Sequence, residues 1–399
     1  MSKKRGLDAL GALRGKRVLV RVDFNVPLER GRVGDDYRIR MALPTITKIV
    51  EAGGRAVLMS HLGRPDGKPD PEASMKPVAD VLGKIMGKKV AFSNAVIGPI
   101  AEAASKKLEN GDVLVIENVR FEAGEKKNDP EFCKALAKLG EVYVNDAFGT
   151  CHRKDASVYG VASLLPAAAG DLVMAEVTHL QPLRDGTAPR PFMVVLGGAK
   201  LGDKIPVIEA LLPRVDKLMI GGGMAYTLLK AQGKKIGKSK HDDALAETAK
   251  KILASTTAAS GRSFVLPSDH VVARGLDDLG GYDICEGDIP DGVMGLDVGP
   301  RTIADFTREL RTAKTVFWNG PLGVFEKPPF HMGTNYIASY LAHRGHETRT
   351  VVGGGDSAAA ARQLGLADKM SFVSTGGGAA LEFVQGVELP GISALPDAK

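Results

Sequence analysis

Cysteine and aromatic residues are scarce in this chain of 399 residues. Its three cysteines, Cys133, Cys151 and Cys285, are far apart and odd in number, which excludes a disulfide framework and a zinc site of clustered cysteines. Aromatic residues make up 5% of the chain, so it has little material for the stacking platforms of nucleic-acid binders. We therefore expect free thiols and a cytoplasmic protein.

Long apolar runs are also missing. No stretch approaches the roughly 18 consecutive apolar residues of a membrane span, and "MSKKRGLDALGALRGKR" at the start has no apolar segment long enough for a secretory signal. We expect no membrane partner. The hydrophobic content of 44% and charged content of 25% are ordinary for a globular protein. The length predicts about two or three domains.

Charge of one sign is not gathered into runs, although the formal net charge is +6. Lysine and arginine are interspersed with acidic residues, whereas a nucleic-acid-binding protein would show clustered basic residues. We therefore expect no nucleic-acid partner. A small and highly charged anionic substrate explains the surplus of positive charge equally well.

What the sequence does contain is a regular alternation of strand and helix patterns. Helical patterns occupy 129–140, 242–257 and 332–345. The strand patterns are mostly continuously apolar, which is typical of parallel sheets covered on both faces. The sequence therefore predicts an α/β protein with doubly wound, Rossmann-like, three-layer domains. The expected strands are 17–26, 56–60, 112–119, 141–148, 191–198, 217–223, 263–272, 315–320, 348–355 and 370–378.

A proline-bounded helical pattern followed by a polar turn cluster, 166–190, predicts the joint between two halves. The distribution of glycine supports this division. Triple glycines occur at 221–223, 353–355 and 376–378, all in the second half. We place the boundary near 170–190.

The stretch "VVGGGDSAAAARQ" (351–363) puts glycine, a weak helix former, directly before alanine, the strongest. Glycines at the start of a helix let an anion approach the backbone N–H groups, although a single turn of this kind is also typical of an ordinary strand–helix connection. Three such turns at one sheet edge favour a phosphate-bearing ligand. Asp356 suits a helix cap or a Mg²⁺ ligand, and the two roles are compatible.

Two further segments of the second half carry candidate ligand-binding groups. Lys200 and Lys204 lie at a strand-to-helix transition before Pro206, where cations are disfavoured unless an anion is bound, or where they are simply solvated. "VFWNGPLGVFE" (316–326), with Glu326, suits a purine and its ribose hydroxyls or a packed core turn. A dinucleotide-dependent dehydrogenase would instead show G-x-G-x-x-G after a strand.

Polar and cationic groups follow the expected strands of the first half. Isolated arginines are usually solvated, but several at one sheet edge repel one another unless an anion neutralises them. These residues therefore predict an anionic substrate, with the carboxylate and amide groups available to its hydroxyls. The set comprises Asp23, Asn25, Arg38, His61, Arg64, Arg120, His152 and Arg153.

Eight motifs together resemble the phosphoglycerate kinase family, in order and over essentially the whole chain. They are "RVDFNVPL", "SHLGRP", "ENVRF", "NDAFGTCHR", "VLGGAK", "WNGPLGVFE", "GGGDS" and "STGGGA". The resemblance implies reversible phosphoryl transfer between 1,3-bisphosphoglycerate and ADP, giving 3-phosphoglycerate and ATP in glycolysis, with Mg²⁺ and as a monomer. It implies a 3-phosphoglycerate-binding domain (1–170), an interdomain helix hinge (171–185), a nucleotide-binding domain (186–385) and a tail returning to the first domain (386–399).

The resemblance also assigns residues. Those implied for the substrate are Asp23, Phe24, Asn25, Arg38, His61, Leu62, Gly63, Arg64, Arg120 and Arg153. Those implied for the nucleotide are Lys204, Gly222, Gly223, Glu326, Gly354, Gly355, Asp356 and Ser357, with Asp356 also at the metal. Those implied for catalysis are Arg38, Lys200, Gly355 and Gly377.

The chain departs from the family pattern in "CHRKD", where small-His-Arg-x-His is usual, so Cys151 and Asp155 are atypical. An acid at 155 should reduce the positive potential near the substrate. The mechanism needs no general base, because the 3-phosphoglycerate carboxylate is already ionised near pH 7. Since charges from both domains are needed together, we expect closure about a hinge near 166–190, aided by the C-terminal segment.

Overall fold

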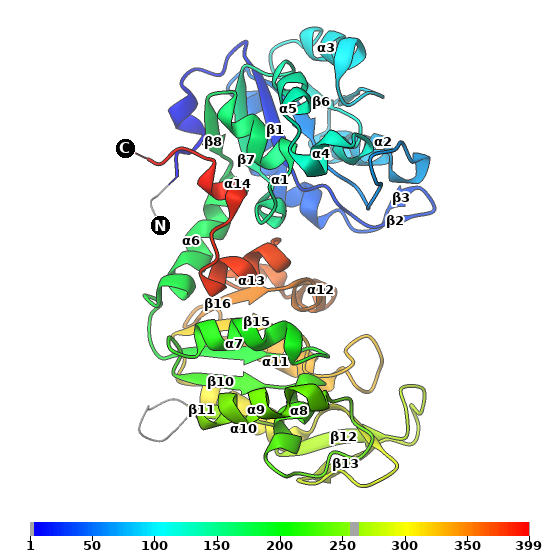
Figure 1. The fold of residues 1–399 in the computed structure, drawn as a ribbon, viewed down its shortest axis with the longest axis vertical. Coiled ribbons are helices and arrows are strands. Elements are labelled where there is room, and N and C mark those ends of the chain that lie inside the picture. Colours follow the sequence, from blue (N-terminus) through cyan, green and yellow to red (C-terminus); the bar gives the residue numbers. More distant parts are fainter. Residues whose placement is uncertain (1–3, 256–262, 399) are drawn as a thin grey trace. The chain divides into compact units, whose positions relative to one another are not determined.

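The computed structural model describes residues 4–255 and 263–398 (Figure 1). The chain forms two compact units, Met1–Thr178 with Glu388–Lys399, and His179–Val387. Within the described residues, none of the helices combines the length and the apolar character that crossing a bilayer requires.

A six-stranded parallel sheet forms the centre of the first unit, in the order β5-β6-β4-β1-β7-β8. β1 is central and pairs in parallel with β4 and β7. The carboxyl ends of these neighbours therefore lie at one edge, where ligands of such sheets bind. The strands are β1 (Arg17–Val22), β4 (Arg55–Met59), β5 (Ala91–Phe92), β6 (Val113–Val115), β7 (Val142–Asp146) and β8 (Ala167–Ala169), and β2 (Leu28–Glu29) and β3 (Arg32–Val33) form a separate hairpin.

Both faces of this sheet are buried. Val18 and Val20 of β1 pack in one cluster with Ile46 of α1 and Leu82 of α2. Leu19, which points to the opposite face because strand side chains alternate, is also fully buried. The arrangement is the predicted three-layer α/β fold. The helices are α1 (Tyr37–Glu51), α2 (Lys76–Met86), α3 (Gly98–Lys106), α4 (Gly124–Lys127), α5 (Pro130–Ala137) and α14 (Pro390–Ser393).

The second unit repeats the design with a parallel sheet in the order β11-β10-β9-β15-β16-β17. Trp318 of β15 and Val195 of β9 pack with Phe306 of α10 and Ile337 of α11 on one face. The strands are β9 (Phe192–Leu196), β10 (Lys217–Ile220), β11 (Ser263–Val265), β15 (Thr315–Asn319), β16 (Arg349–Gly353) and β17 (Phe372–Val373). The helices are α7 (Ile205–Leu211), α8 (Met224–Ala231), α9 (Ala246–Ala254), α10 (Pro300–Leu310), α11 (Met332–His343), α12 (Gly355–Gln363) and α13 (Gly378–Gln385).

The single strand expected over 263–272 is wrong. The segment forms β11 and then β12 (Asp269–Ala273), which belong to different sheets. Pro267 lies between them, and proline lacks the N–H that a continuous inner strand would need. β12 pairs antiparallel with β13 (Asp283–Glu286) and β14 (Met294–Val298), a small sheet that the sequence patterns did not predict.

Helix α6 (Asp171–Asp185) occupies the span where an interdomain helix was expected, and the division between the units falls within it. Its first turn is capped by Asp146, whose Oδ1 accepts hydrogen bonds from the N–H groups of Leu172 (2.9 Å) and Val173 (3.4 Å). The neighbouring Asn145 Nδ2 donates to the carbonyl oxygen of Gly391 in the C-terminal segment (3.1 Å). The "ND" of the "NDAFGTCHR" motif thus holds two distant parts of the chain within the first unit.

Candidate functional site

The end of β1 and the end of β4 meet at the carboxyl edge of the first sheet. Asp23 and Asn25 follow β1, and His61 and Gly63 follow β4. Asn25 Oδ1 accepts a hydrogen bond from the N–H of Gly63 at 2.9 Å, which joins the two loops directly. These predicted substrate residues therefore lie together.

Helix α1 adds a cation to this edge from its first turn. Arg38 Nη1 donates to Asp23 Oδ2 at 3.0 Å and to the carbonyl oxygen of Asn25 at 3.2 Å. Its side chain is one-third exposed, while Asp23 is almost fully buried. Asp23 thus orients the Arg38 guanidinium, and part of that guanidinium stays accessible to a ligand.

Two predicted substrate residues have side chains that are buried in the core, and their backbone groups hold the loops of the site in place. Phe24 and Leu62 are buried in the core cluster. The N–H of Phe24 donates to Ser60 Oγ (2.9 Å), and the carbonyl oxygen of Leu62 accepts from Asn118 Nδ2 (2.7 Å). Their side chains are covered, so they shape the loops from beneath.

The remaining arginines differ in exposure. Arg120, from the short helix after β6, is 5% exposed and donates from Nη1 to the carbonyl oxygen of Gly63 at 2.8 Å. Its Nε has no hydrogen-bond partner among the described residues. Arg153 is exposed and donates from Nε to His152 Nε2 at 3.1 Å, and Arg64 is exposed.

The electrostatics of His61 show that the cations converge. Burial and the positive charges around the ring hold the pKa of His61 well below its usual value near 6.5. Four guanidinium groups contribute to this shift, in decreasing order those of Arg21, Arg120, Arg153 and Arg38. The site is therefore a concentrated positive region that an anion would neutralise.

Asp155 lies inside this positive region. It is buried, its Oδ2 has no hydrogen-bond partner among the described residues, and its charge raises the pKa of Arg120 against the lowering effect of burial. The acid at position 155 therefore acts on a predicted substrate arginine. Cys151 is fully buried, and its thiol has a pKa raised by burial to about 12, so this cysteine is not a nucleophile.

Sequence reasoning missed Arg21, which is part of the quoted "RVDFNVPL" motif but lies within β1. It is fully buried and donates from Nη2 to His61 Nδ1 at 3.2 Å. The available signal was a charged residue inside an otherwise apolar strand, since a strand buried on both faces has no solvent for it.

In the second unit, loops from four strand ends surround one pocket of about 340 Å³. Gly198 lines it after β9, Gly222 and Gly223 after β10, Glu326 after β15 and Asp356 after β16. Sequence reasoning missed several other residues of its wall, which come from α8, the unpredicted small sheet and the loops beside them. They include Tyr226 of α8, Met294 and Leu296 of β14, and two loop residues, Lys240 after α8 and Leu276 between β12 and β13.

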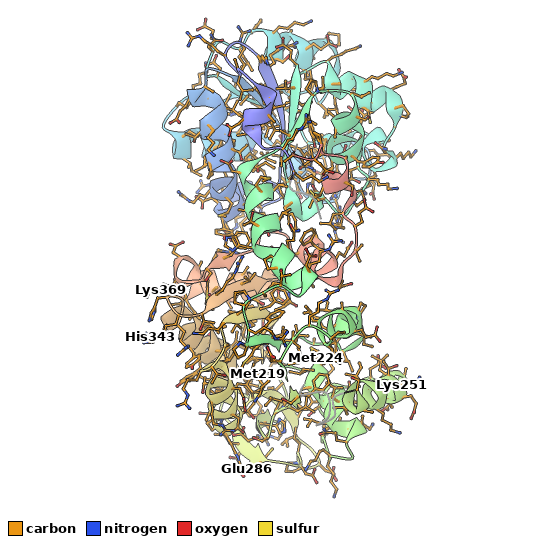
Figure 2. All side chains as sticks on the ribbon, turned by 90° about the vertical axis from the view of Figure 1, so that its left-hand side faces the viewer. Met219, Met224, Lys251, Glu286, His343 and Lys369 are labelled. Atoms are coloured by element: carbon orange, nitrogen blue, oxygen red, sulfur yellow. The ribbon has the colours of Figure 1, made fainter. Side chains whose placement is uncertain are left out.

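The triple glycines serve two different purposes. Gly222 has a φ of +67°, and a Cβ there would lie 2.7 Å from the carbonyl oxygen of Gly198, so this turn is packed against another loop. Met219 and Met224 on either side of the turn are fully buried (Figure 2). By contrast, a Cβ at Gly355 or Gly377 would meet nothing within 4 Å. The first triplet is thus required by packing. In the second triplet Gly353 and Gly354 are also packed, and only Gly355, like Gly377 of the third, leaves open space before a helix.

The two predicted lysines have different environments. Lys204 is half-buried, donates from Nζ to Asn319 Oδ1, and has a pKa lowered by burial, a shift opposed by the charges of Asp356 and Asp203. Lys200 is exposed. Helix α7 begins at Ile205, with Pro206 in its first turn as expected. Lys204 is therefore a fixed cation close to the Asp356 carboxylate.

The first turn of α12 presents Asp356 to solvent. Gly354 occupies the N-cap position, with a φ of +92°, and it has no side chain to cap the helix. Ser357 is buried, and its Oγ accepts a hydrogen bond from the N–H of Gly320. Within residues 4–255 and 263–398, no three His, Cys, Asp or Glu side chains are grouped as a metal site. A cation at Asp356 would thus need ligands from outside the protein.

Trp318 belongs to the core rather than to the pocket. It is fully buried, and its Nε1 donates to the carbonyl oxygen of Gly320 at 2.9 Å. Of the two interpretations of the "VFWNGPLGVFE" segment, the packed turn therefore applies to the tryptophan, whereas the end of the segment lines the pocket with Pro321, Leu322, Gly323, Val324 and Glu326.

A larger pocket of about 670 Å³ lies elsewhere in the second unit, along α10 and α11. Its walls are mainly apolar and include Tyr336, Met332 and Ile284, and none of the predicted site residues lines it. Glycine turns and helix N-termini, the features that suit phosphate, occur at the smaller pocket instead.

Comparison with known proteins gives a consistent result. The family model described as Phosphoglycerate kinase matches residues 7–387. The phosphoglycerate kinase of Clavibacter michiganensis subsp. michiganensis (strain NCPPB 382) is 49% identical over 402 residues, covering 98% of each chain. That of Chloroflexus aurantiacus (strain ATCC 29366 / DSM 635 / J-10-fl) is 50% identical over 390 residues, covering 96% of this chain and 97% of the relative.

Solved structures are similar over the same extent. The phosphoglycerate kinase of Coxiella burnetii matches with a TM-score of 0.85 and 40% identity, covering 96% of both chains. The phosphoglycerate kinase of Pyrococcus horikoshii OT3 matches with a TM-score of 0.85 and 31% identity, covering 98% of both chains.

Proposed function

The chain belongs to the phosphoglycerate kinase family, and on that premise we propose which of its residues carry the reaction. The reaction is the reversible transfer of a phosphoryl group between 1,3-bisphosphoglycerate and ADP, which gives 3-phosphoglycerate and ATP. Each unit is assigned one of the two substrates.

The first unit binds 3-phosphoglycerate or 1,3-bisphosphoglycerate. The observation that carries this assignment is the convergence of guanidinium groups on His61, because a permanent cluster of cations is stable only with an anionic partner. Asp23 and Asn25 are available to the substrate hydroxyl. The remaining binding groups are Arg38, Gly63, Arg64, Arg120 and Arg153, with Phe24 and Leu62 shaping the loops from beneath.

The second unit binds ADP or ATP in the pocket of about 340 Å³. Glu326 accepts from the ribose hydroxyls, and Gly222 and Gly223 form the floor beneath the nucleoside. Lys204 meets the α-phosphate, and the first turn of α12, with Gly354, Gly355, Asp356 and Ser357, receives the terminal phosphates. The support is the open space in front of Gly355 and the N-terminal end of α12.

The residues at the start of α12 fit a magnesium ion bound together with the nucleotide. Mg²⁺ typically takes one or two protein carboxylates and fills its other positions with phosphate oxygens and water. Asp356 is exposed and supplies one such carboxylate. When bound, the ion would neutralise charge on the phosphate oxygens.

Transfer then depends on alignment and charge neutralisation, because the attacking carboxylate is already ionised. Arg38 from the first unit and Lys200 from the second neutralise the migrating phosphoryl group, with the backbone N–H groups at Gly355 and Gly377. Since these groups belong to different units, turnover requires an in-line arrangement reached by domain closure, with α6 and the C-terminal segment as the hinge. Closure also excludes water from the acyl phosphate.

A coupled assay on the purified, monomeric protein tests this function. We expect ATP consumption that requires both 3-phosphoglycerate and Mg²⁺. ATP consumption without 3-phosphoglycerate, or none with it, would contradict the proposal.

A further inference from the structure

The side chain of Arg21 is one of the largest fully buried side chains among the described residues. A guanidinium stays protonated in a protein and only donates hydrogen bonds, so a buried one must be surrounded by acceptors. Its position in the middle of the sheet, beneath the candidate substrate site, makes the identity of those acceptors important.

The acceptors form a directed chain. Arg21 Nε donates to Ser157 Oγ at 2.7 Å. The Ser157 hydroxyl has one proton, which it donates to Glu125 Oε1 at 2.5 Å, so its lone pairs remain for Arg21. The N–H of Ser157 donates to the other carboxylate oxygen, Glu125 Oε2, at 2.9 Å. Glu125 is fully buried and therefore fixes Ser157, which fixes Arg21.

At the other end of these hydrogen bonds, Arg21 determines which ring nitrogen of His61 carries the proton. Arg21 Nη1 donates to the carbonyl oxygen of Val22, and Nη2 donates to His61 Nδ1 at 3.2 Å. Because arginine cannot accept, His61 Nδ1 must carry the lone pair, and the ring proton must lie on Nε2. Protonating Nδ1 would place two donors against each other.

The cations around His61 also disfavour protonation of its ring. Apart from Asp23, whose Oδ1 lies 4.0 Å from His61 Nδ1, the charged groups identified around the ring are cationic. Burial and these cations hold the pKa of His61 well below 6.5, so the ring is neutral at physiological pH. The cations are Arg21, Arg120, Arg153 and Arg38.

We propose that Glu125 and Ser157 are positioning residues for the reaction, which act through Arg21 to fix His61 as a neutral Nε2–H donor to an anionic oxygen of the substrate. The identity of that substrate rests on the proposed function. A neutral donor adds a hydrogen bond without adding a further positive charge to the arginine cluster. Substrate binding then needs no proton uptake by His61 between about pH 5.5 and 8.

Nitrogen-15 NMR of the histidine rings in the ligand-free protein tests the first part directly. We expect His61 in the wild type to show the Nε2–H tautomer and no titration from pH 5.5 to 8. A His61 that titrates near pH 6.5, or that carries its proton on Nδ1, would overturn the proposal. This readout needs no substrate, so it stays separate from the assay of the function itself.

The Ser157→Ala variant tests the positioning role, with Ser105→Ala as the matched control, because Ser105 is a fully buried serine in α3. In Ser157→Ala we expect a mixture of His61 tautomers and a raised pKa of His61. The KM for 3-phosphoglycerate should increase by about threefold to tenfold, with kcat little changed. Ser105→Ala should leave the His61 tautomer, the His61 pKa and the KM unchanged. A wild-type His61 spectrum and KM in Ser157→Ala would refute the role.

Glu125→Gln provides a second route if Ser157→Ala does not fold. The amide keeps the shape and one acceptor but loses the charge, so the same changes should appear at smaller size. Circular dichroism monitors folding of each variant. Unchanged His61 signals together with an unchanged KM in a folded Glu125→Gln protein would also refute the proposal.

Discussion

The first unit surrounds its candidate site with guanidinium side chains, whereas the second lines its pocket with glycine backbone and the first turns of helices. Around His61, four arginines contribute positive charge, Asp23 lies 4.0 Å from the ring, and Asp155 lies beside Arg120. In the second unit, Gly222 and Gly223 line the pocket, and Gly355 and Gly377 leave open space before α12 and α13. On the proposed function, a phosphate group would meet guanidinium charges in the first unit and backbone dipoles in the second.

The two solutions have different structural requirements. Clustered cations repel one another, so the first unit contains the buried Glu125 and the Ser157 relay that orient Arg21. Glycine turns carry no charge, but glycine loses more conformational entropy on folding than other residues. In the second unit, the Gly221–Gly223 turn packs against the loop after β9. Removing a side chain should therefore damage the first site, and adding one should damage the second.

The largest effect is expected from Arg38→Ala. On the proposed function, the substitution removes the cation that neutralises the migrating phosphoryl group, so turnover should fall by roughly two decades or more. The coupled assay measures this, with Arg40→Ala as control, since Arg40 is an exposed residue of the same helix paired with Asp36. Normal turnover in Arg38→Ala would remove Arg38 from the chemistry.

Gly222→Ala should mainly affect stability. A Cβ there would lie 2.7 Å from the Gly198 carbonyl oxygen, and the backbone φ of +67° disfavours any residue with a side chain. Such strain costs about 1–3 kcal/mol in the free energy of unfolding. Trp318, the single tryptophan, lies in the core of the second unit and reports its urea unfolding by fluorescence.

Gly355→Ala separates packing from ligand approach within the same kind of motif. The new Cβ meets no neighbour, so the unfolding midpoint should not fall, whereas turnover should drop by about tenfold or more because the terminal phosphates are displaced. A large loss of stability in Gly355→Ala, or none in Gly222→Ala, would show that the two glycines do not differ as described.

A buried carboxyl group caps a helix in each unit, and the two should differ in pH dependence. Burial raises the pKa of Asp146, at the start of α6, to about 8, and that of Asp297, which accepts from the N–H of Gly333 in α11, to about 7. A raised pKa means that the folded state holds the proton more tightly. The associated stability is present below about pH 4 and is lost as pH rises through the folded pKa.

Asp146→Asn keeps an acceptor for the Leu172 N–H but cannot ionise. Relative to the wild type, it should therefore gain stability between pH 5 and pH 8 in urea unfolding followed by circular dichroism. Asp297→Asn should show most of its gain by pH 7, in Trp318 fluorescence. Parallel pH profiles for wild type and variant would contradict this account of the two caps.

The smallest effect is expected from Asp155→Asn. Removing the negative charge beside Arg120 should strengthen 3-phosphoglycerate binding by about twofold to fivefold at low salt. Glu131→Gln is the control, since Glu131 is exposed and paired with Lys134. Weaker binding in Asp155→Asn would mean that the carboxylate orients Arg120 rather than reducing its field.

Local sequence patterns predicted the fold class and a joint between two halves within 166–190, because buried parallel strands and helices leave periodic signals. The helix over 171–185 was implied by the family resemblance. The strand break at Pro267 was readable but was overlooked within an apolar run. The role of Arg21 was not readable, since its partners Ser157 and Glu125 are more than 100 positions away in the chain. The division of the glycines was also hidden, because only tertiary contacts distinguish Gly222 from Gly355.

Titration calorimetry of 3-phosphoglycerate and of MgADP against Arg38→Ala and Gly355→Ala tests the division between the units most directly. The account predicts that Arg38→Ala weakens binding of 3-phosphoglycerate alone and that Gly355→Ala weakens binding of MgADP alone. Loss of MgADP binding in Arg38→Ala, or of 3-phosphoglycerate binding in Gly355→Ala, would contradict it.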